Sequence, residues 1–182
     1  MKKVLLSVHP KWCELIFNGK KTIEVRRTRP KLEPPFEVLV YETKGQFIKS
    51  VKGACTTYGY GRGKVIGSFI CDRIDEIKPD LEYYSDGYDI DDDRLAETCL
   101  TREQLREYGK GVTLYGWHIT EPKLFDKPKE FYELYVPCKK NKQTADESCK
   151  GCAYAYKGTT SGEIYCDNAL IRPPQSFCYV EE

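Results

Sequence analysis

The chain has 182 residues, of which 40% are hydrophobic and 31% charged, and its 29 basic and 28 acidic side chains leave a formal net charge of +1. This length suits one domain with a small elaboration, and the balanced charge excludes a general electrostatic attraction to nucleic acid. Basic residues still gather between Lys20 and Lys31, and aspartates between Asp89 and Asp93. The uneven distribution of charge therefore indicates where a charged ligand could bind.

The first segment, Lys3 to Val8, is predicted as a short strand. Its apolar run ends at His9-Pro10, which is shorter than the roughly 7–15 residues of a signal peptide's apolar region. No run reaches the about 20 apolar residues of a membrane helix. We therefore expect a soluble, cytoplasmic protein without membrane contact, whose nine cysteines are thiols or metal ligands rather than a disulfide framework.

A short helix is predicted from Pro10 to Asn18, because proline suits a first helical turn and Asn18-Gly19 suits a helix end. Three further strands are predicted from alternating apolar residues, at Phe36–Glu42, Lys64–Ile74 and Val112–Ile119. Residues 44–62 are predicted as a loop or lid and the acid-rich residues 79–94 as an exposed loop. A second short helix, from Leu100 to Gly109, is predicted by its Thr101 capping box.

The charged strand that follows Gly19 carries the most informative pattern. Alternation places Ile23 and Val25 on one face and Glu24 and Arg26 on the other. Lys21, just after the turn, is expected to lean over the same edge. An ammonium, a carboxylate and a guanidinium would then converge on one polar ligand. A solvated strand face with a weak ion pair is the alternative that the residue types leave open.

Strands outnumber helices and the helices are short, so the predicted fold class is α+β, mainly β. A small, bent, mostly antiparallel β-barrel over residues 1–136 would close its own sheet edges, and Gly67 is expected to mark a bulge in its longest strand. Residues 137–182 are predicted as a small cysteine-rich extension that packs on the barrel.

The extension contains a candidate zinc site. Cys149 and Cys152 have the spacing by which two thiolates hold one zinc ion from a tight turn. Cys138 and Cys166 are predicted to complete the tetrahedron, with Cys178 as the substitute. A redox pair and unliganded thiols are the alternatives that the spacing leaves open.

Several segments in consistent order between Lys2 and Leu124 resemble the ASCH family, namely Leu6-Ser7-Val8-His9-Pro10, Gly19-x-Lys21-x-x-Glu24-x-Arg26, the strand around Tyr41, Val65-Ile66-Gly67 and Tyr115-Gly116-Trp117-His118-Ile119. The terminal run Pro173 to Tyr179 is similar to the tail of phage-type and bacterial members. The resemblance implies a barrel like that of pseudouridine synthases and archaeosine transglycosylases (PUA-like), with a cleft under the first helix for RNA or a modified nucleoside.

Enzymatic members of that family include amidohydrolases that act on N4-acetylcytidine. The resemblance places their catalytic lysine at Lys21 and maps a glutamate onto Glu97. Their threonine nucleophile falls at Glu24, and a carboxylate does not replace an activated hydroxyl, which argues against that chemistry. If the chain is an enzyme, Lys21, Glu24 and Glu97 are the candidate catalytic residues of an amidohydrolase-like or ribonuclease-like hydrolase.

A binding role uses the same residues without catalysis. Lys21 and Arg26 would contact a phosphate or a base edge, and Glu24 would accept from an exocyclic amine. The full set of predicted ligand-binding residues is Ser7, Lys21, Glu24, Arg26, Tyr41, Trp117 and His118. Of these, the aromatic rings would stack on an unpaired base, with a place in the core as the alternative for Trp117 and a structural imidazole for His118.

The sequence therefore leaves three functions. The first is binding of RNA, a nucleotide or a modified nucleoside in a basic cleft. The second is a small hydrolase acting on a nucleoside or an RNA phosphodiester. The third is a regulatory protein-interaction module.

Overall fold

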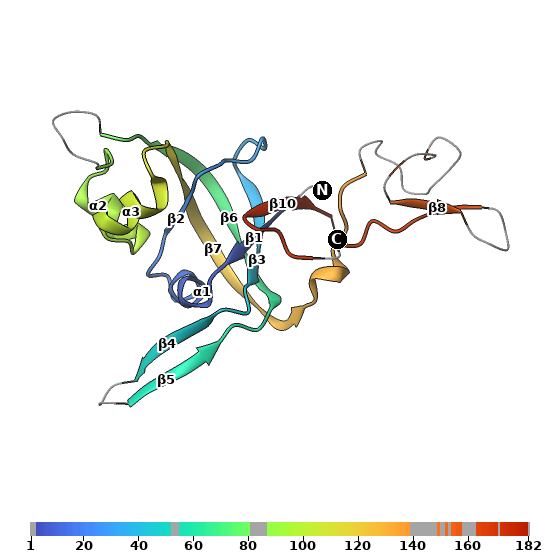
Figure 1. The fold of residues 1–182 in the computed structure, drawn as a ribbon, viewed down its shortest axis with the longest axis horizontal. Coiled ribbons are helices and arrows are strands. Elements are labelled where there is room, and N and C mark those ends of the chain that lie inside the picture. Colours follow the sequence, from blue (N-terminus) through green and yellow to red (C-terminus); the bar gives the residue numbers. More distant parts are fainter. Residues whose placement is uncertain are drawn as a thin grey trace.

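The structure, a computed structural model, describes residues 3–51, 55–80, 87–138, 149, 152, 154–157, 163–170 and 172–181. Its elements in chain order are β1 (Lys3–Val8), α1 (Pro10–Phe17), β2 (Ile23–Arg26), β3 (Phe36–Glu42), β4 (Gln46–Val51), β5 (Cys55–Tyr60), β6 (Lys64–Ile77), α2 (Asp92–Thr98), α3 (Arg102–Gly109), β7 (Leu114–Lys129), the 3-10 turn η1 (Phe131–Glu133), β8 (Ala155–Lys157), β9 (Ile164–Cys166) and β10 (Phe177–Val180) (Figure 1).

A six-stranded mixed sheet forms the body of the molecule, in the order β10-β1-β3-β6-β7-β2. Only β1 and β3 run parallel; the other neighbours in this sheet are antiparallel. The prediction of a mainly β fold with short helices is confirmed. The expected closed barrel is wrong, because β10 and β2 are the two ends of the sheet and no pairing within the described ranges joins them. Helix α1 packs against the sheet, where it contacts β3 and β7.

The two long strands β6 and β7 give the sheet its bend. Their pairing shifts register at three places, the first between Val65 and Gly67, which confirms the predicted bulge. A methyl group on Gly67 would meet the Lys123 carbonyl oxygen at 2.4 Å and the Phe17 ring at 2.7 Å. Glycine is therefore required here by close approach of the neighbouring chain.

Three apolar clusters make up the core. One lies against α1 and includes Trp117 and Phe69. A second contains Leu5, Leu39 and Tyr41 and is joined by residues from the end of the chain, such as Leu170 and Val180. The third packs helices α2 and α3 on the strands β2, β6 and β7; its buried members are Ile23, Val25, Ile77, Tyr88, Ile90, Leu105 and Leu114.

Residues 44–62, predicted as a loop, contain a β-hairpin instead. β4 pairs antiparallel with β5, from Gln46 opposite Tyr60 to Val51 opposite Cys55, and Figure 1 shows the hairpin projecting from the body. Threonine and tyrosine favour strands, and this propensity outweighed the glycines that suggested a loop.

The predicted exposed loop over residues 79–94 is also corrected in part. Helix α2 begins at Asp92, and the Asp91 side chain caps it by accepting from the Arg94 backbone N–H. Aspartates at a helix start accept from free N–H groups and suit the helix dipole, so this acidic run begins a helix. Residues 81–86 of the predicted loop lie outside the described residues. Helix α3 confirms its predicted capping box.

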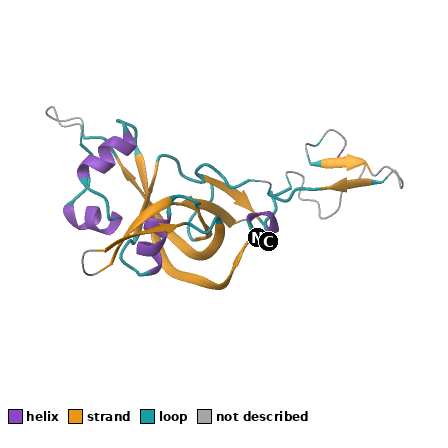
Figure 2. Ribbon diagram, turned by 60° about the horizontal axis from the view of Figure 1, so that its bottom comes forward, coloured by secondary structure: helices purple, strands orange, loops and turns teal. Residues whose placement is uncertain are grey.

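The end of the chain returns to the sheet. β10 pairs antiparallel with β1, from Lys3 opposite Val180 to Leu6 opposite Phe177. The β8–β9 hairpin instead lies away from the sheet in both views (Figures 1 and 2). The domain boundary between residues 136 and 137 stays a prediction. None of the helices in the described ranges combines the length and apolar composition needed to cross a membrane.

Candidate functional site

The charged residues of β2 lie on the face predicted for them. Ile23 and Val25 pack in the core cluster beneath α2 and α3. Glu24 points to the other face, where it is only 5% exposed, and Lys21 beside it is 2% exposed. The alternative of a solvated strand face is therefore wrong for these two residues.

Glu24 is the shared partner of two cations. Its Oε2 atom lies 3.3 Å from the Lys21 Nζ atom, and its Oε1 atom lies 2.9 Å from the Arg26 Nη2 atom. Arg26 also donates from Nη2 to the Ser7 carbonyl oxygen at 2.7 Å. This bond ties the edge strand β2 to β1 by a side chain rather than by backbone pairing. The cluster of Lys21, Glu24 and Arg26 therefore contains two positive charges and one negative charge, which gives it a positive excess.

Lys21 is held by two further groups. Its Nζ atom donates to the Thr98 carbonyl oxygen at the end of α2, where the partial negative charge of a helix end favours a cation. The same atom lies 5.1 Å from the centroid of the Trp12 ring. The turn after α1 places the lysine there, because Gly19 adopts a φ of 69° and the Lys21 N–H donates to the Leu15 carbonyl oxygen.

The cluster borders a cavity of about 500 Å³, lined by Ser7, His9, Trp12, Lys21, Glu24, Val25, Arg26, Leu100, Gln104, Glu107 and Tyr108. Among these, the Nε atom of Arg26 is buried and has no hydrogen-bond partner within the described part of the chain. A buried donor left without a partner is costly. Nε itself is enclosed, so a ligand in the cavity would reach this guanidinium through the part of the Arg26 side chain that is exposed, which is 12%.

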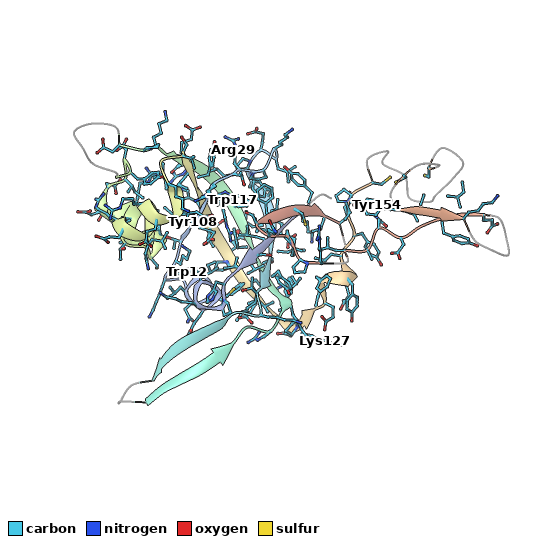
Figure 3. All side chains as sticks on the ribbon, viewed as in Figure 1. Trp12, Arg29, Tyr108, Trp117, Lys127 and Tyr154 are labelled. Atoms are coloured by element: carbon cyan, nitrogen blue, oxygen red, sulfur yellow. The ribbon has the colours of Figure 1, made fainter. Side chains whose placement is uncertain are left out.

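The aromatic rings beside this cavity are Trp12 and Tyr108, which the sequence analysis did not assign to the site. Trp12 is partly exposed on α1, and Tyr108 near the end of α3 is 38% exposed (Figure 3). The Lys11 Nζ atom lies 4.6 Å from the Trp12 ring centroid, and the Arg27 guanidinium lies 5.3 Å from that of Tyr108. Trp12 lies four residues before buried Ile16, at the edge of the apolar face of α1, and this position in a short helix beside the charged strand was the available signal.

Trp117 and Tyr41 are not stacking platforms in this structure. Trp117 has no exposed surface and packs edge-on against Phe36 and Phe177, at centroid distances of 6.0 and 5.4 Å. Tyr41 is 4% exposed and belongs to the cluster on the other side of the sheet, where it meets Phe131. Both rings belong to the core, because nearly all of their apolar surface is buried there.

His118 and Glu97 also lie outside the cavity lining. The His118 Nε2 atom is 2.8 Å from a carboxylate oxygen of Asp75, and Arg73 contacts the same ring. The Glu97 side chain is exposed, although its backbone carbonyl accepts from the Thr22 N–H. The structural imidazole is thus the better description of His118, and the structure does not bring Glu97 together with Lys21 and Glu24 in the cavity lining, so its catalytic role stays a prediction.

Ser7 does line the cavity, but its hydroxyl is engaged elsewhere. The Oγ atom donates to the Pro174 carbonyl oxygen at 2.6 Å. Lys21 is meanwhile occupied by Glu24 and Thr98. The structure therefore does not show the pairing of Ser7 with Lys21 that would activate a hydroxyl.

A larger hollow of about 1120 Å³ is lined by residues 136–138, by Tyr154 and by residues between Asp167 and Tyr179, which include the start of β10. Its charged lining residues are Asp167 and Arg172, and much of the rest is proline, apolar and aromatic. We place the candidate site in the smaller cavity, because buried charges and a buried unpartnered donor mark functional sites better than volume does.

Comparison with known proteins identifies the family. The model of the ASCH domain matches residues 6–135. The chain belongs to the ASCH domain family. The predicted family is therefore confirmed, and the ASCH domain is a PUA-like fold generally associated with RNA binding. The placement of this chain among phage-type or bacterial members stays a prediction.

Solved ASCH structures share the fold. The crystal structure of ASCH from Zymomonas mobilis has a TM-score of 0.54 at 15% identity, covering 99% of this chain and 88% of that one. A tyrosine-to-phenylalanine mutant of the same protein has a TM-score of 0.55 at 15% identity, covering 100% and 92%. A serine-to-alanine mutant has 0.54 at 15% identity, covering 99% and 89%. Among curated proteins, none matches the chain.

Proposed function

We propose that the cavity binds a nucleotide unit, either within RNA or as a free or modified nucleoside or nucleotide. The single observation that carries this proposal is the convergence of Lys21, Glu24 and Arg26 on the wall of the cavity, where one carboxylate faces both cations. A guanidinium matches the acceptor pattern of a phosphate or of a base edge. Glu107 in the lining offsets the positive excess of the cluster, so the two cations support an acceptor-rich ligand rather than a general attraction for anions.

Glu24 adds the ability to accept hydrogen bonds. Each of its carboxylate oxygens already faces one cation, but an ionised carboxylate offers about four lone-pair sites. Two sites thus remain for the amine of a base. A group that both donates and accepts on one wall supports recognition of a base edge rather than of a bare phosphate.

Trp12 and Tyr108 supply faces for stacking. Both line the cavity, Tyr108 is 38% exposed and Trp12 is partly exposed, so a base could stack on the ring surface that the cations beside them leave open. Stacking of a base on an aromatic ring contributes about 1–3 kcal/mol and tolerates any base. The combination of aromatic faces with a positive cluster supports a single-stranded nucleotide, whose base is unpaired.

The test is binding of a labelled short single-stranded RNA by fluorescence anisotropy, with competition by the four ribonucleoside monophosphates. Arg26→Lys keeps a cation beside Glu24 but removes the Nε donor, so we expect a fold that melts normally and affinity that falls about tenfold. The matched control is Arg29→Ala, which removes a charge 41% exposed and outside the cavity lining.

The control distinguishes binding at a specific site from a general electrostatic attraction of RNA to the protein surface. Arg29→Ala should lower affinity slightly and reduce the salt dependence, as loss of one distant charge does. Equal losses in the two variants, or no binding of any probe by the wild-type protein, would contradict the proposal.

A hydrolase is the second candidate, and the buried Lys21–Glu24 pair favours it. An ammonium 3.3 Å from a carboxylate can deliver a proton while the carboxylate accepts one from water. Incubation with an N4-acylated cytidine and with a short RNA tests this activity by product analysis. Turnover that is lost in both Lys21→Met and Glu24→Gln, while RNA binding persists in one of them, would establish hydrolysis over binding alone.

A further inference from the structure

We propose that Cys138, Cys149, Cys152 and Cys166 form a structural zinc site in the extension, with one ion held by four thiolates. This site is separate from the ASCH cavity and does not depend on its function. Two sets of backbone contacts bring the four cysteines near one another.

The first relationship joins Cys138 to Cys166. Tyr135 and Ala169 form an antiparallel bridge. The Val136 N–H donates to the Asn168 carbonyl oxygen at 2.8 Å beside this isolated bridge. The Asn168 side-chain amide donates back to the Val136 carbonyl oxygen at 2.7 Å. Cys138 lies two residues beyond Val136 and Cys166 two residues before Asn168, so both cysteines lie close along the chain to this contact.

The second relationship joins Cys166 to the pair at Cys149 and Cys152. The Cys152 N–H donates to the Cys149 carbonyl oxygen at 2.9 Å, which closes a tight turn between the two cysteines. The Ala155 N–H donates to the Cys152 carbonyl oxygen, and Ala155 is the register partner of Cys166 in the β8–β9 hairpin. The hydrogen bond between Ala155 and Cys152 therefore joins this turn to the residue that pairs with Cys166.

The side chains still have to turn toward one centre. As they are placed, the described residues include no group of three or more His, Cys, Asp or Glu side chains that could hold a metal ion. A cysteine side chain reorients about χ1 alone, so binding of one ion by all four requires new side-chain rotamers at these positions. Four soft thiolates select zinc among the common divalent ions of proteins.

Cys178 does not belong to the set. It lies in β10 opposite Leu5, and burial raises the pKa of its thiol to about 11. It packs beside the cluster that contains Leu39 and Tyr41. A buried thiol in the main sheet is a small apolar group rather than a metal ligand.

The experiment measures metal in the full chain, grown with added zinc and purified without chelators or metal columns. We expect close to one zinc ion per chain, as a closed four-ligand site requires. Cys149→Ser and Cys166→Ser should each lose the bound zinc. The matched controls Cys99→Ser, in the α2–α3 connection, and Cys178→Ser should keep it.

A second measurement keeps the test valid if a variant misfolds. The wild-type protein is stripped of metal under reducing conditions and titrated with Co²⁺, whose tetrahedral thiolate complex has strong sulfur-to-cobalt charge-transfer absorption. We expect saturation at one ion and displacement of cobalt by zinc. Three results would overturn the proposal: metal-free protein that takes up no cobalt, iron in place of zinc, or full zinc retention in Cys166→Ser.

Discussion

Glu24 lies directly opposite Trp117 in the antiparallel pairing of β2 with β7. Directly opposed residues place their side chains on the same face of a sheet. One of the two is a carboxylate between two cations, and the other is a fully buried ring in the apolar core. The change from core to polar cavity therefore takes place across a single pair of residues at the edge of the sheet.

Removal of the Glu24 charge should destabilise the fold more than removal of the Lys21 charge. Glu24→Gln leaves two buried cations without their shared partner, whereas Lys21→Met leaves Glu24 paired with Arg26. We expect a loss of about 3 kcal/mol for Glu24→Gln and a smaller loss for Lys21→Met. Urea unfolding of both variants measures the difference, and a greater loss in Lys21→Met would contradict the arrangement.

The two tryptophans should respond in opposite ways to truncation. Trp117→Ala empties a fully buried position and should cost about 3–5 kcal/mol of unfolding free energy. Trp12→Ala should cost less stability than Trp117→Ala, because Trp12 is only partly buried against the core, and should weaken RNA binding by about 1–3 kcal/mol, since its ring lines the cavity. Thermal unfolding and anisotropy on the same samples test this, and reduced binding without destabilisation in a conservative Trp117→Phe variant would contradict it.

Stability should fall in alkaline solution partly through Cys71. Burial raises the pKa of this thiol from its ordinary value of 9.0 to about 12. The unfolded chain therefore loses the proton first, so the stability that the buried neutral thiol contributes is fully present below pH 9.0 and is lost as the pH rises toward about 12. Urea unfolding of Cys71→Ala between these values should show a shallower decline than the wild type, and an identical decline would refute this assignment.

A methyl group at Gly67 should disturb the bulge between β6 and β7. Gly67→Ala brings the added carbon to 2.4 Å from the Lys123 carbonyl oxygen, and backbone cannot move aside cheaply. We expect a loss of about 1–3 kcal/mol. Gly116→Ala is the control, because its closest contact is a side-chain methyl of Ile23 at 3.0 Å. Losses of the same size at both positions would count against a special role for the bulge.

Much of the fold follows from local pattern. The period of two in β2 correctly assigned Ile23 and Val25 to one face and Glu24 to the other. The Thr101 capping box correctly placed α3. These signals depend on neighbours in the chain, so they are readable before any tertiary contact is known.

The aromatic part of the site depends on tertiary contacts and was therefore misassigned. Trp117 and Tyr41 alternate on strands in the same way as residues that face a cleft, and only the packing of Phe177 and Phe131 against them shows that they are core. Tyr108 reaches the cavity because α3 packs on β2, a relationship between distant segments. Sheet closure likewise depends on pairing between the two end strands β10 and β2, which lie far apart in the sequence, and periodicity does not report such pairing.

Whether the cavity is the binding site is tested most directly by NMR of the Arg26 Nε–H group while a short single-stranded RNA is added. We expect the Arg26 signal to shift and to become protected from exchange. The signal of the Trp12 indole N–H should also shift, whereas that of the Trp117 indole N–H should not. RNA binding that leaves the Arg26 and Trp12 signals unchanged would show that the ligand contacts another surface, and the cavity would then not be the binding site.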